Sequence, residues 1–293
     1  MQVHFVDGTY ELFRYFYSPS GRHLNAAGEP VGAARGVLRS LVSLLESGVT
    51  HLGVATDHVI PSFRNDLWEG YKTGDGIDPH LFAQFPLVER VVESLGVTVW
   101  PMVDFEADDA LAAAAAVAER DDRVEQILIC SPDKDLAQCV GGKVFQFDRR
   151  ADEFRDADAI LAKYGVPPGS IPDWLALVGD TADGFPGLAG WGAKTAATVL
   201  RRYGHLEDIP HEPGRWDVDG VRGAKKLAET LASDFENAML FKRLATLVTD
   251  VDVGAVDEWR WNGPRDNFAE VAERIDATNV IKRVAKLAGR QGC

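Results

Sequence analysis

Residues 3–18, VHFVDGTYELFRYFYS, decide the fold of this chain. An apolar run with the composition of a β-strand ends in an acid, turns at a glycine and continues as an amphipathic helical pattern. An apolar run that ends in an acid returns at residues 51–57, HLGVATD, and at residues 126–135, QILICSPDKD. Short apolar runs separated by helical segments predict an α/β fold with a mainly parallel sheet covered by helices on both faces.

The composition is that of a soluble globular enzyme. The chain has 293 residues, 46% hydrophobic and 26% charged, so it can bury a full core as one large domain or two smaller ones. Its three cysteines lack the spacing of a disulfide framework, and no apolar run reaches the roughly 18 residues of a membrane helix. The N-terminus has no signal-peptide pattern. We therefore expect a cytoplasmic monomer with no membrane partner.

The positions of the acidic residues matter more than their number. The net charge of −14 argues at first against a polyanionic partner such as nucleic acid. The acidic surplus falls within residues 1–183, however, and many of these acids follow apolar runs, at the edge where open α/β sheets bind ligands. Nine carboxylates occupy such places or elements that can reach them: Asp7, Asp57, Glu106, Asp108, Asp109, Asp133, Asp135, Asp180 and Asp183.

Carboxylates that converge need a counter-charge, because they repel one another. Hard divalent cations are the usual solution, and the lack of His or Cys partners favours Mg²⁺ or Mn²⁺. Two such ions would activate a water and stabilise the leaving oxygen in phosphodiester hydrolysis. The alternative for each acid is a structural one, as a helix cap or as a favourable charge near a helix dipole. The number of acids favours the metal cluster. Asp180 and Asp183 have the spacing of one helix face.

A glycine-rich turn within residues 179–204, GDTADGFPGLAGWGAKTAATVLRRYG, indicates phosphate binding. Glycines let a backbone approach a phosphate closely, and a helix that begins at Ala193 would offer free amide groups. The alternative is a turn that serves only helix packing. The candidate DNA-binding residues here are Gly187, Gly190, Gly192, Lys194 and Thr195.

These motifs resemble the bacterial 5′→3′ exonucleases and flap endonucleases, including the N-terminal nuclease domain of DNA polymerase I. The resemblance is carried by VDGTY, GEPVGAARGVLRSL, PSFRNDLWEGYK, FEADDALA, SPDKDLAQ and GDTADGFPGLAGWGAKTAATVL, in the family's order over roughly residues 1–205. The resemblance implies a PIN-like (resolvase-like) nuclease core over residues 1–165, with a helical arch at about 64–94. It implies a helical region over residues 166–293, with a DNA-binding helix–three-turn–helix at about 179–204.

The resemblance also assigns roles to the site residues. Two divalent metals are implied, with a potassium ion often held by the backbone of the helix–three-turn–helix. Asp7, Asp57, Glu106 and Asp108 lean to the first divalent metal, and Asp133, Asp135, Asp180 and Asp183 to the second, with Asp109 behind them. Lys72 matches the family lysine that stabilises the scissile phosphate, so the catalytic set is Lys72, Asp7, Asp57, Asp133 and Asp135. Arg14 and Arg64 are further candidates for phosphate contacts.

The implied activity is metal-dependent 5′→3′ exonuclease and flap endonuclease cleavage of branched, nicked or 5′-ended DNA, with the 5′ ends of RNA primers as a further substrate. The resemblance implies that this activity takes place in the bacterial cytoplasm, at the nucleoid.

Some residues depart from the family pattern. Asp75 stands where the family usually has an Arg, and residues 65–89 hold five acids and one Lys where a basic funnel is expected. An acidic arch should weaken capture of a single-stranded flap. Trp68, Tyr71 and Phe82 could stack on bases or pack in the interior. Two alternatives therefore stay open: a DNA-junction-binding protein with little or no nuclease activity, and an RNA-cleaving PIN enzyme.

Overall fold

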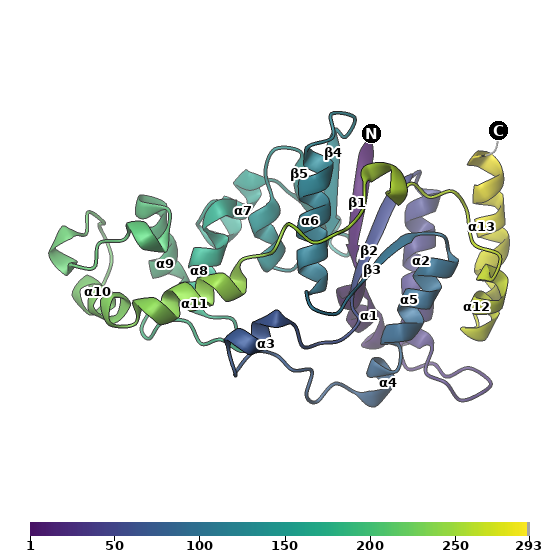
Figure 1. Cartoon of the computed structure of the whole chain (residues 1–293), viewed down its shortest axis with the longest axis horizontal. Coiled ribbons are helices and arrows are strands. Elements are labelled where there is room, and N and C mark those ends of the chain that lie inside the picture. Colours follow the sequence, from purple (N-terminus) through teal and green to yellow (C-terminus); the bar gives the residue numbers. More distant parts are fainter. Residues whose placement is uncertain (292–293) are drawn as a thin grey trace. The chain divides into compact units, whose positions relative to one another are not determined.

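The structure, a computed structural model, describes residues 1–291 and contains two compact units (Figure 1). Unit 1 is built from residues 1–60, 74–131 and the C-terminal part from residue 248. Unit 2 is built from residues 61–73 and 132–247. Both units are therefore discontinuous in sequence, and the predicted division at residue 165 stays a prediction. None of the helices between residues 1 and 291 is both long and apolar enough to cross a membrane.

Four parallel strands form the centre of unit 1. They are β1 (Gln2–Asp7), β2 (His51–Asp57), β3 (Thr98–Met102) and β4 (Gln126–Cys130), in the order β3-β2-β1-β4. Phe5 of β1 lies opposite Gly53 of β2 and Ile129 of β4, so the three neighbouring strands share one direction. This confirms the predicted parallel sheet. Parallel strands end at one edge, which is where Asp7 and Asp57 lie.

Helices cover both faces of this sheet (Figure 1). On one face lie α1 (Gly8–Phe16), α2 (Gly32–Glu46) and α5 (Phe85–Ser94), with α12 (Phe268–Arg274) and α13 (Thr278–Gln291) packed outside them. The Ala-rich α6 (Ala107–Glu119) lies across all four strands on the other face. Small side chains let α6 bury most of its positions, because its backbone can approach the sheet closely.

Three buried indoles fix the returning C-terminal segment onto unit 1. The Nε1 atoms of Trp100 and Trp259 both donate to the carbonyl oxygen of Val253, at 3.1 and 2.8 Å. Trp261 Nε1 donates to Leu95 O at 2.7 Å. The ring of Trp259 meets Phe5 of β1 edge-on, with ring centroids 5.0 Å apart. Each large aromatic surface is thus buried with its polar atom paired, which is the condition for a stable buried indole.

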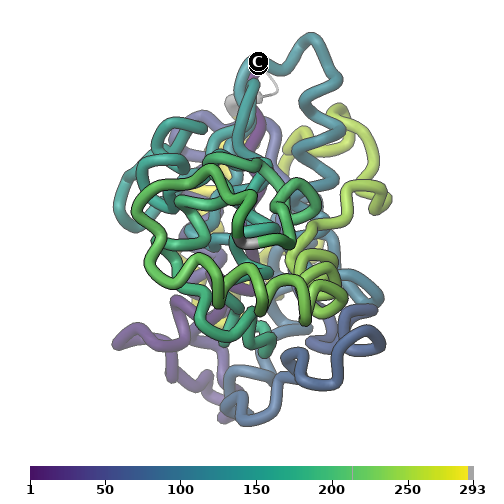
Figure 2. Tube along the Cα trace, turned by 90° about the vertical axis from the view of Figure 1, so that its left-hand side faces the viewer, coloured from purple at the N-terminus to yellow at the C-terminus, as the bar shows by residue number. Residues whose placement is uncertain are grey.

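Unit 2 is mainly helical and has a core of its own. Its antiparallel strand pair is β5 (Val144–Asp148) and β6 (Glu153–Arg155). Its helices are α3 (Phe63–Leu67), α7 (Ala157–Tyr164), α8 (Ile171–Val178), α9 (Ala193–Tyr203), α10 (Ala224–Ser233) and α11 (Phe235–Ala245). Helix α8 packs against α9 and α11, and α10 against α11 (Figures 1 and 2). Leu175, Phe185, Val199 and Phe241 are among the buried residues of this core.

The segment predicted as an arch contains three helices, of which α4 (Pro79–Phe82) is the shortest. Its last helix, α5, buries Phe85, Val88 and Val91 in unit 1, so α5 is a core helix of that unit. Tyr71 is buried in the core of unit 2, while 54% of Phe82 is exposed. Of the three aromatic residues weighed for base stacking, Phe82 alone presents most of its surface to solvent.

Gly8 allows α1 to begin directly after Asp7. A Cβ atom at this position would lie 2.8 Å from Ala55 O, Thr56 Cγ2 and Val54 Cγ1 of the neighbouring strand. Any side chain at position 8 would push α1 away from β2. Because Asp7 is the N-cap of α1, its carboxylate would move as well.

We expect Gly8→Ala to lower the free energy of unfolding by about 1–3 kcal/mol, the usual cost of overpacking. The matched control is Gly289→Ala in α13, where the added methyl meets nothing within 4 Å. There the same change should stabilise the protein by about 0.5–1 kcal/mol, because alanine favours the helix. Urea unfolding of both variants measures the two effects. Shifts of the same sign would contradict the close approach at Gly8.

Candidate metal centre

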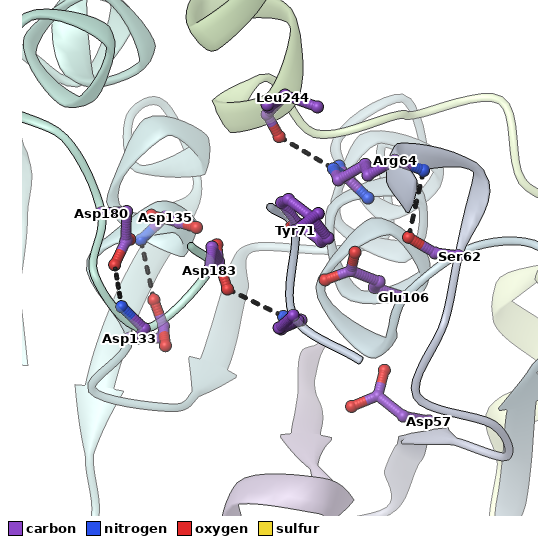
Figure 3. A network of polar contacts seen from close by, with 12 residues as sticks. Asp57, Ser62, Arg64, Tyr71, Glu106, Asp133, Asp135, Asp180, Asp183 and Leu244 are labelled. Carbon is purple, nitrogen blue, oxygen red and sulfur yellow. Dashed lines mark hydrogen bonds and ion pairs between the residues drawn. The ribbon is translucent and has the colours of Figure 1, made fainter. Parts of the chain in front are cut away.

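Three carboxylates of unit 2 gather in its interior. One carboxylate oxygen from each of Asp135, Asp180 and Asp183 lies within 4.8 Å of the other two, and all three residues are buried. Asp135 opens a short 3-10 helix, Asp135–Cys139, and the other two acids lie after α8 (Figure 3). The exposed Asp133 is tied to the set, since its Oδ1 accepts from Asp135 N at 3.0 Å. We call Asp133, Asp135, Asp180 and Asp183 the unit 2 acid set.

A tight turn, not a helix, brings Asp180 and Asp183 together. Asp180 N donates to Phe185 O at 2.8 Å, and the amides of Gly184 and Phe185 donate back to Asp180 O. The spacing of this pair also fits one face of a helix, but no helix forms here. Phe185 explains the difference, because its buried ring requires the chain to fold back into the core of unit 2. The turn keeps the two acids as close as one helical face would.

Two lysines neutralise part of this charge. Lys134 Nζ lies 2.7 Å from Asp180 Oδ2, and Lys72 Nζ lies 2.9 Å from Asp183 Oδ1. Burial pushes the pKa of Asp183 upward, but the attraction and hydrogen bond of Lys72 outweigh it and bring that pKa below its usual value. Within the part of the chain that the structure describes, no lysine forms an ion pair with Asp135. Its burial, reinforced by repulsion from the neighbouring acids, raises the pKa of its carboxyl well above the usual range.

The unit 2 acid set fits a hard divalent cation. Asp135 Oδ1 is buried and has no hydrogen-bond partner among the described residues, which is unusual for a carboxylate oxygen. The donors around it are carboxylate oxygens, the ligand type that hard cations prefer. A cation bound here would supply the missing partner and remove the repulsion. Asp135, Asp180 and Asp183 are the side chains that would hold it.

The acids of unit 1 serve the starts of helices. Asp7 Oδ1 accepts from Tyr10 N at 2.8 Å, and its Oδ2 accepts from Ser131 Oγ at 3.0 Å. Asp57 Oδ1 accepts from Ala107 N, the first amide of α6, at 2.8 Å. The structural alternative thus holds for these residues. It does not compete with metal binding, since a carboxylate that caps a helix still offers further lone pairs.

Asp109 has a different environment from the other acids of α6. It is fully buried, and its two oxygens accept from Glu106 N at 3.0 Å and from Val248 N at 2.9 Å. It therefore ties the start of α6 to the segment that follows residue 247. This geometry supports a structural role for Asp109. Glu106 is buried and Asp108 half-buried at the same helix start. The convergence of the acids of the two units stays a prediction of the sequence.

Comparisons with known proteins agree with these features. A family model described as "5'-3' exonuclease, N-terminal resolvase-like domain" matches residues 2–165, and one described as "5'-3' exonuclease, C-terminal SAM fold" matches residues 166–267. The chain is 30% identical to the 5'-3' exonuclease of Aquifex aeolicus over 289 residues, covering 97% of this chain and 96% of the relative. The chain belongs to the 5'-3' exonuclease family.

Other relatives and solved structures extend this result. DNA polymerase I of Rhizobium leguminosarum is 32% identical over 294 residues, which are 96% of this chain and 28% of the polymerase. The chain thus spans less than a third of that relative. A structure of T5 5'-exonuclease with bound zinc ions has a TM-score of 0.67 at 17% identity, covering 99% of this chain and 98% of the other. The catalytic core of Rad2 in complex with DNA substrate has a TM-score of 0.63 at 17% identity, covering 98% and 92%. These likenesses confirm the predicted α/β fold.

The two arginines predicted as phosphate contacts are both engaged within the protein. Only 1% of Arg64 is exposed, and its guanidinium donates to Leu244 O and Thr246 O, the carbonyls at the end of α11 (Figure 3). Arg64 therefore caps a helix C-terminus, and the expected phosphate contact is not supported. Arg14 makes a two-pronged ion pair with the buried Glu11. That pair leaves Arg14 only partly exposed.

The glycine-rich turn of this 5'-3' exonuclease family member depends on a close backbone approach. Gly187 adopts a φ of +68°, and a Cβ there would lie 2.3 Å from Gly179 N. The turn leads to Gly192, the N-cap of α9, and then to the exposed Lys194 and the half-buried Thr195. Gly190, with a φ of +85°, is also exposed. The free amides at the start of α9 and the nearby lysine therefore face solvent, as phosphate binding requires.

The segment that carries Lys72 is fastened to the acidic turn. Lys72 N donates to Asp183 O at 3.0 Å, and Trp68 Nε1 donates to Gly184 O at 3.0 Å. Gly184 adopts a φ of +87° and lies close to Gly70. A Cβ atom on residue 184 would lie 2.0 Å from the carbonyl oxygen of Gly70. These contacts were not predicted. Lys134 was also overlooked as a site residue, although its position between two acids in SPDKD was the available signal.

We expect Asp135→Asn to stabilise the metal-free protein by about 1 kcal/mol, or roughly 2–4 °C in Tm, because a buried like charge is removed. The pKa of Asp135 is raised in the folded state, so its charge costs stability as the pH rises above the unfolded value. The gain should therefore be largest near pH 8 and disappear toward pH 4 (about the unfolded pKa). Asp219→Asn, at an exposed loop position, is the control and should change Tm little. A lower Tm for Asp135→Asn without metal would contradict the repulsion described above.

Proposed function

We propose that this protein is a divalent-metal-dependent 5′→3′ exonuclease and flap endonuclease that hydrolyses phosphodiester bonds in 5′-ended, nicked or branched DNA. The observation that carries the proposal is the buried triad of Asp135, Asp180 and Asp183 in a chain of the 5'-3' exonuclease family. One oxygen of the triad, Asp135 Oδ1, has no hydrogen-bond partner among residues 1–291. A stable fold has no need for such a costly group of charges. A metal-dependent nuclease does need it.

Mg²⁺ or Mn²⁺ is the proposed cofactor, in two or more copies. Carboxylate-only ligation suits these ions, and the solved T5 exonuclease named above was described with divalent metal ions. The unit 2 acid set would hold one ion, and the acids of unit 1 would hold the other. When bound, the ions activate a water molecule and offset the negative charge of the phosphodiester. The unit 1 ligands are Asp7, Asp57, Glu106 and Asp108.

Lys72 is the proposed contact to the scissile phosphate. Its ammonium group is partly exposed and is held by Asp183, so it stands at the margin of the unit 2 acid set. A short swing away from Asp183 would let Nζ donate to a non-bridging phosphate oxygen. A positive charge placed there stabilises the charge that develops in the transition state. Asp75, three residues later in the chain, is by contrast an exposed acid.

The turn from Gly187 to Thr195 is the proposed grip on duplex DNA. It offers exposed glycine backbone, the N-terminus of α9 and the side chain of Lys194. These groups can contact phosphates without reading the base sequence, as a structure-specific nuclease requires. A potassium ion held by backbone carbonyls of this turn would strengthen the contact. Basic residues of α9 and α10 are further candidates for phosphate contacts, namely Arg201, Arg202, Lys225 and Lys226.

DNA is the proposed partner, with the 5′ ends of RNA primers as a further substrate. The Rad2 structure with DNA substrate shares this fold, and a duplex grip suits both substrates. A DNA-junction-binding protein with little nuclease activity is the second candidate. The exposed Asp75 favours it, because an acidic residue at that point weakens phosphate capture. We further propose that the protein acts as a monomer in the cytoplasm.

The direct test uses a 5′-labelled flap duplex and its nicked counterpart, with Mg²⁺ or Mn²⁺. The wild type should release short 5′ products only when metal is present. Asp135→Asn should cut at least about 10²-fold more slowly, as is typical when a charge-stabilising group is lost. Lys282→Met, at an exposed position of α13, is the matched control and should cut normally. Binding to the junction without cleavage in either metal would contradict the nuclease proposal. That result would favour a DNA-junction-binding protein with little nuclease activity.

A binding measurement tests the role of Lys194. Lys194→Met should weaken binding to all duplex sequences alike, because a phosphate contact carries no sequence information. It should also reduce the slope of log K against log salt concentration by about 0.9, the value expected for one lost phosphate contact. Fluorescence anisotropy over a range of salt concentrations measures both, with Lys282→Met as the reference. An unchanged salt slope would exclude Lys194 from the DNA interface.

A further inference from the structure

The unit 2 acid set carries its own cation. Lys134 follows Asp133 and precedes Asp135 in the chain, and its Nζ lies 2.7 Å from Asp180 Oδ2. About a third of the Lys134 side chain is exposed, while 2% of the Asp180 side chain is. The ammonium group therefore reaches the buried acids from the solvent side. It is bound by one strong contact and is not enclosed.

The contact with Lys134 occupies one of the two Asp180 oxygens that could bind a metal. Asp180 Oδ1 already accepts a hydrogen bond from Ala182 N at 3.0 Å, within the tight turn. Oδ2 is the oxygen that this hydrogen bond leaves free of the turn, and Lys134 holds it. A divalent ion on the same carboxylate would lie a few ångströms from the ammonium group. At that separation the two cations repel strongly in a partly buried site.

The chain gives Lys134 an advantage over a free cation. Its backbone lies between the two acids Asp133 and Asp135, so the ammonium group cannot diffuse away from the site. A tethered group competes at a high effective concentration. Its flexible stem nevertheless allows it to move several ångströms into solvent when a stronger ligand arrives. Lys72 does not duplicate this function, because its partner is the other acid of the turn, Asp183.

We propose that Lys134 is a resident counter-cation that holds the unit 2 acid set together without metal and leaves Asp180 when a divalent ion binds. This inference rests on the proposed metal-dependent function. Lys134 is a positioning residue and takes no part in the reaction. Its presence lowers the affinity of the site for metal, and its departure prepares Asp180 as a ligand. In the metal-free protein, the positive charge of Lys134 offsets the repulsion among the three buried acids.

The test replaces Lys134 by methionine, which has a similar length and no charge. In Mn²⁺ titrations of the full chain, followed by calorimetry, Lys134→Met should bind Mn²⁺ about tenfold more tightly than the wild type, since the competing charge is absent. Its metal-free Tm should fall, and added Mn²⁺ should restore it. Lys282→Met should match the wild type in both measurements. An equal or weaker affinity of Lys134→Met for Mn²⁺ would overturn the proposal.

A second measurement on the wild-type protein needs no variant, so it still decides if Lys134→Met does not fold. Acetic anhydride modifies exposed lysines, and mass spectrometry reports the rate at each position. Addition of Mg²⁺ should speed the modification of Lys134 several-fold and leave that of Lys282 unchanged. An unchanged or slower rate at Lys134, in protein that calorimetry shows to bind metal, would overturn this inference alone. Failure of the wild type to bind Mg²⁺ or Mn²⁺ would overturn the proposed function and this inference together.

Discussion

Repulsion among buried carboxylates is the constraint around which unit 2 is organised. Asp135, Asp180 and Asp183 are buried, and one carboxylate oxygen from each lies within 4.8 Å of the other two. Each further feature of the site answers that repulsion. Two lysines pair with two of the acids, and a turn closed by backbone hydrogen bonds fixes the distance between Asp180 and Asp183. The third acid keeps an oxygen with no partner among the described residues. We infer that this oxygen is kept for a metal ion.

In unit 1 the needs of the fold and of the site coincide. A helix that follows a parallel strand begins at the carboxyl edge of the sheet, and its first amides need acceptors there. Asp7 and Asp57 supply such acceptors for α1 and α6. The same edge is where a substrate would bind. Acids at this edge can therefore cap helices and still offer lone pairs to a metal. The structural role and the metal-binding role of these acids are compatible.

Local sequence patterns predicted much of this structure. Alternating apolar runs and helical patterns predicted the parallel sheet, which the structure confirms. Acids that follow those runs predicted candidate site residues, of which Asp135, Asp180 and Asp183 lie close together in unit 2. Spacing could not separate a helix from a turn at Asp180 and Asp183, because both geometries bring residues three apart onto one side. The buried ring of Phe185 decided for the turn. The discontinuous units also left no local mark, since they depend on contacts between distant segments.

Arg64 shows a similar limit of sequence reasoning. An arginine beside a candidate active site suggests a phosphate contact, yet its partners lie about 180 residues away at the end of α11. No local sequence pattern predicts that Arg64 caps the C-terminus of α11. For Lys134 the signal is local, because the SPDKD motif shows a lysine between two acids. The structure adds that its ammonium group pairs with Asp180 Oδ2.

Anomalous diffraction from crystals soaked in Mn²⁺ would locate the bound metal directly. We expect an anomalous peak bounded by Asp135, Asp180 and Asp183, with Lys134 turned away from Asp180. A structure in which Mn²⁺ avoids these carboxylates at saturating concentration, while Lys134 stays on Asp180 Oδ2, would contradict this expectation.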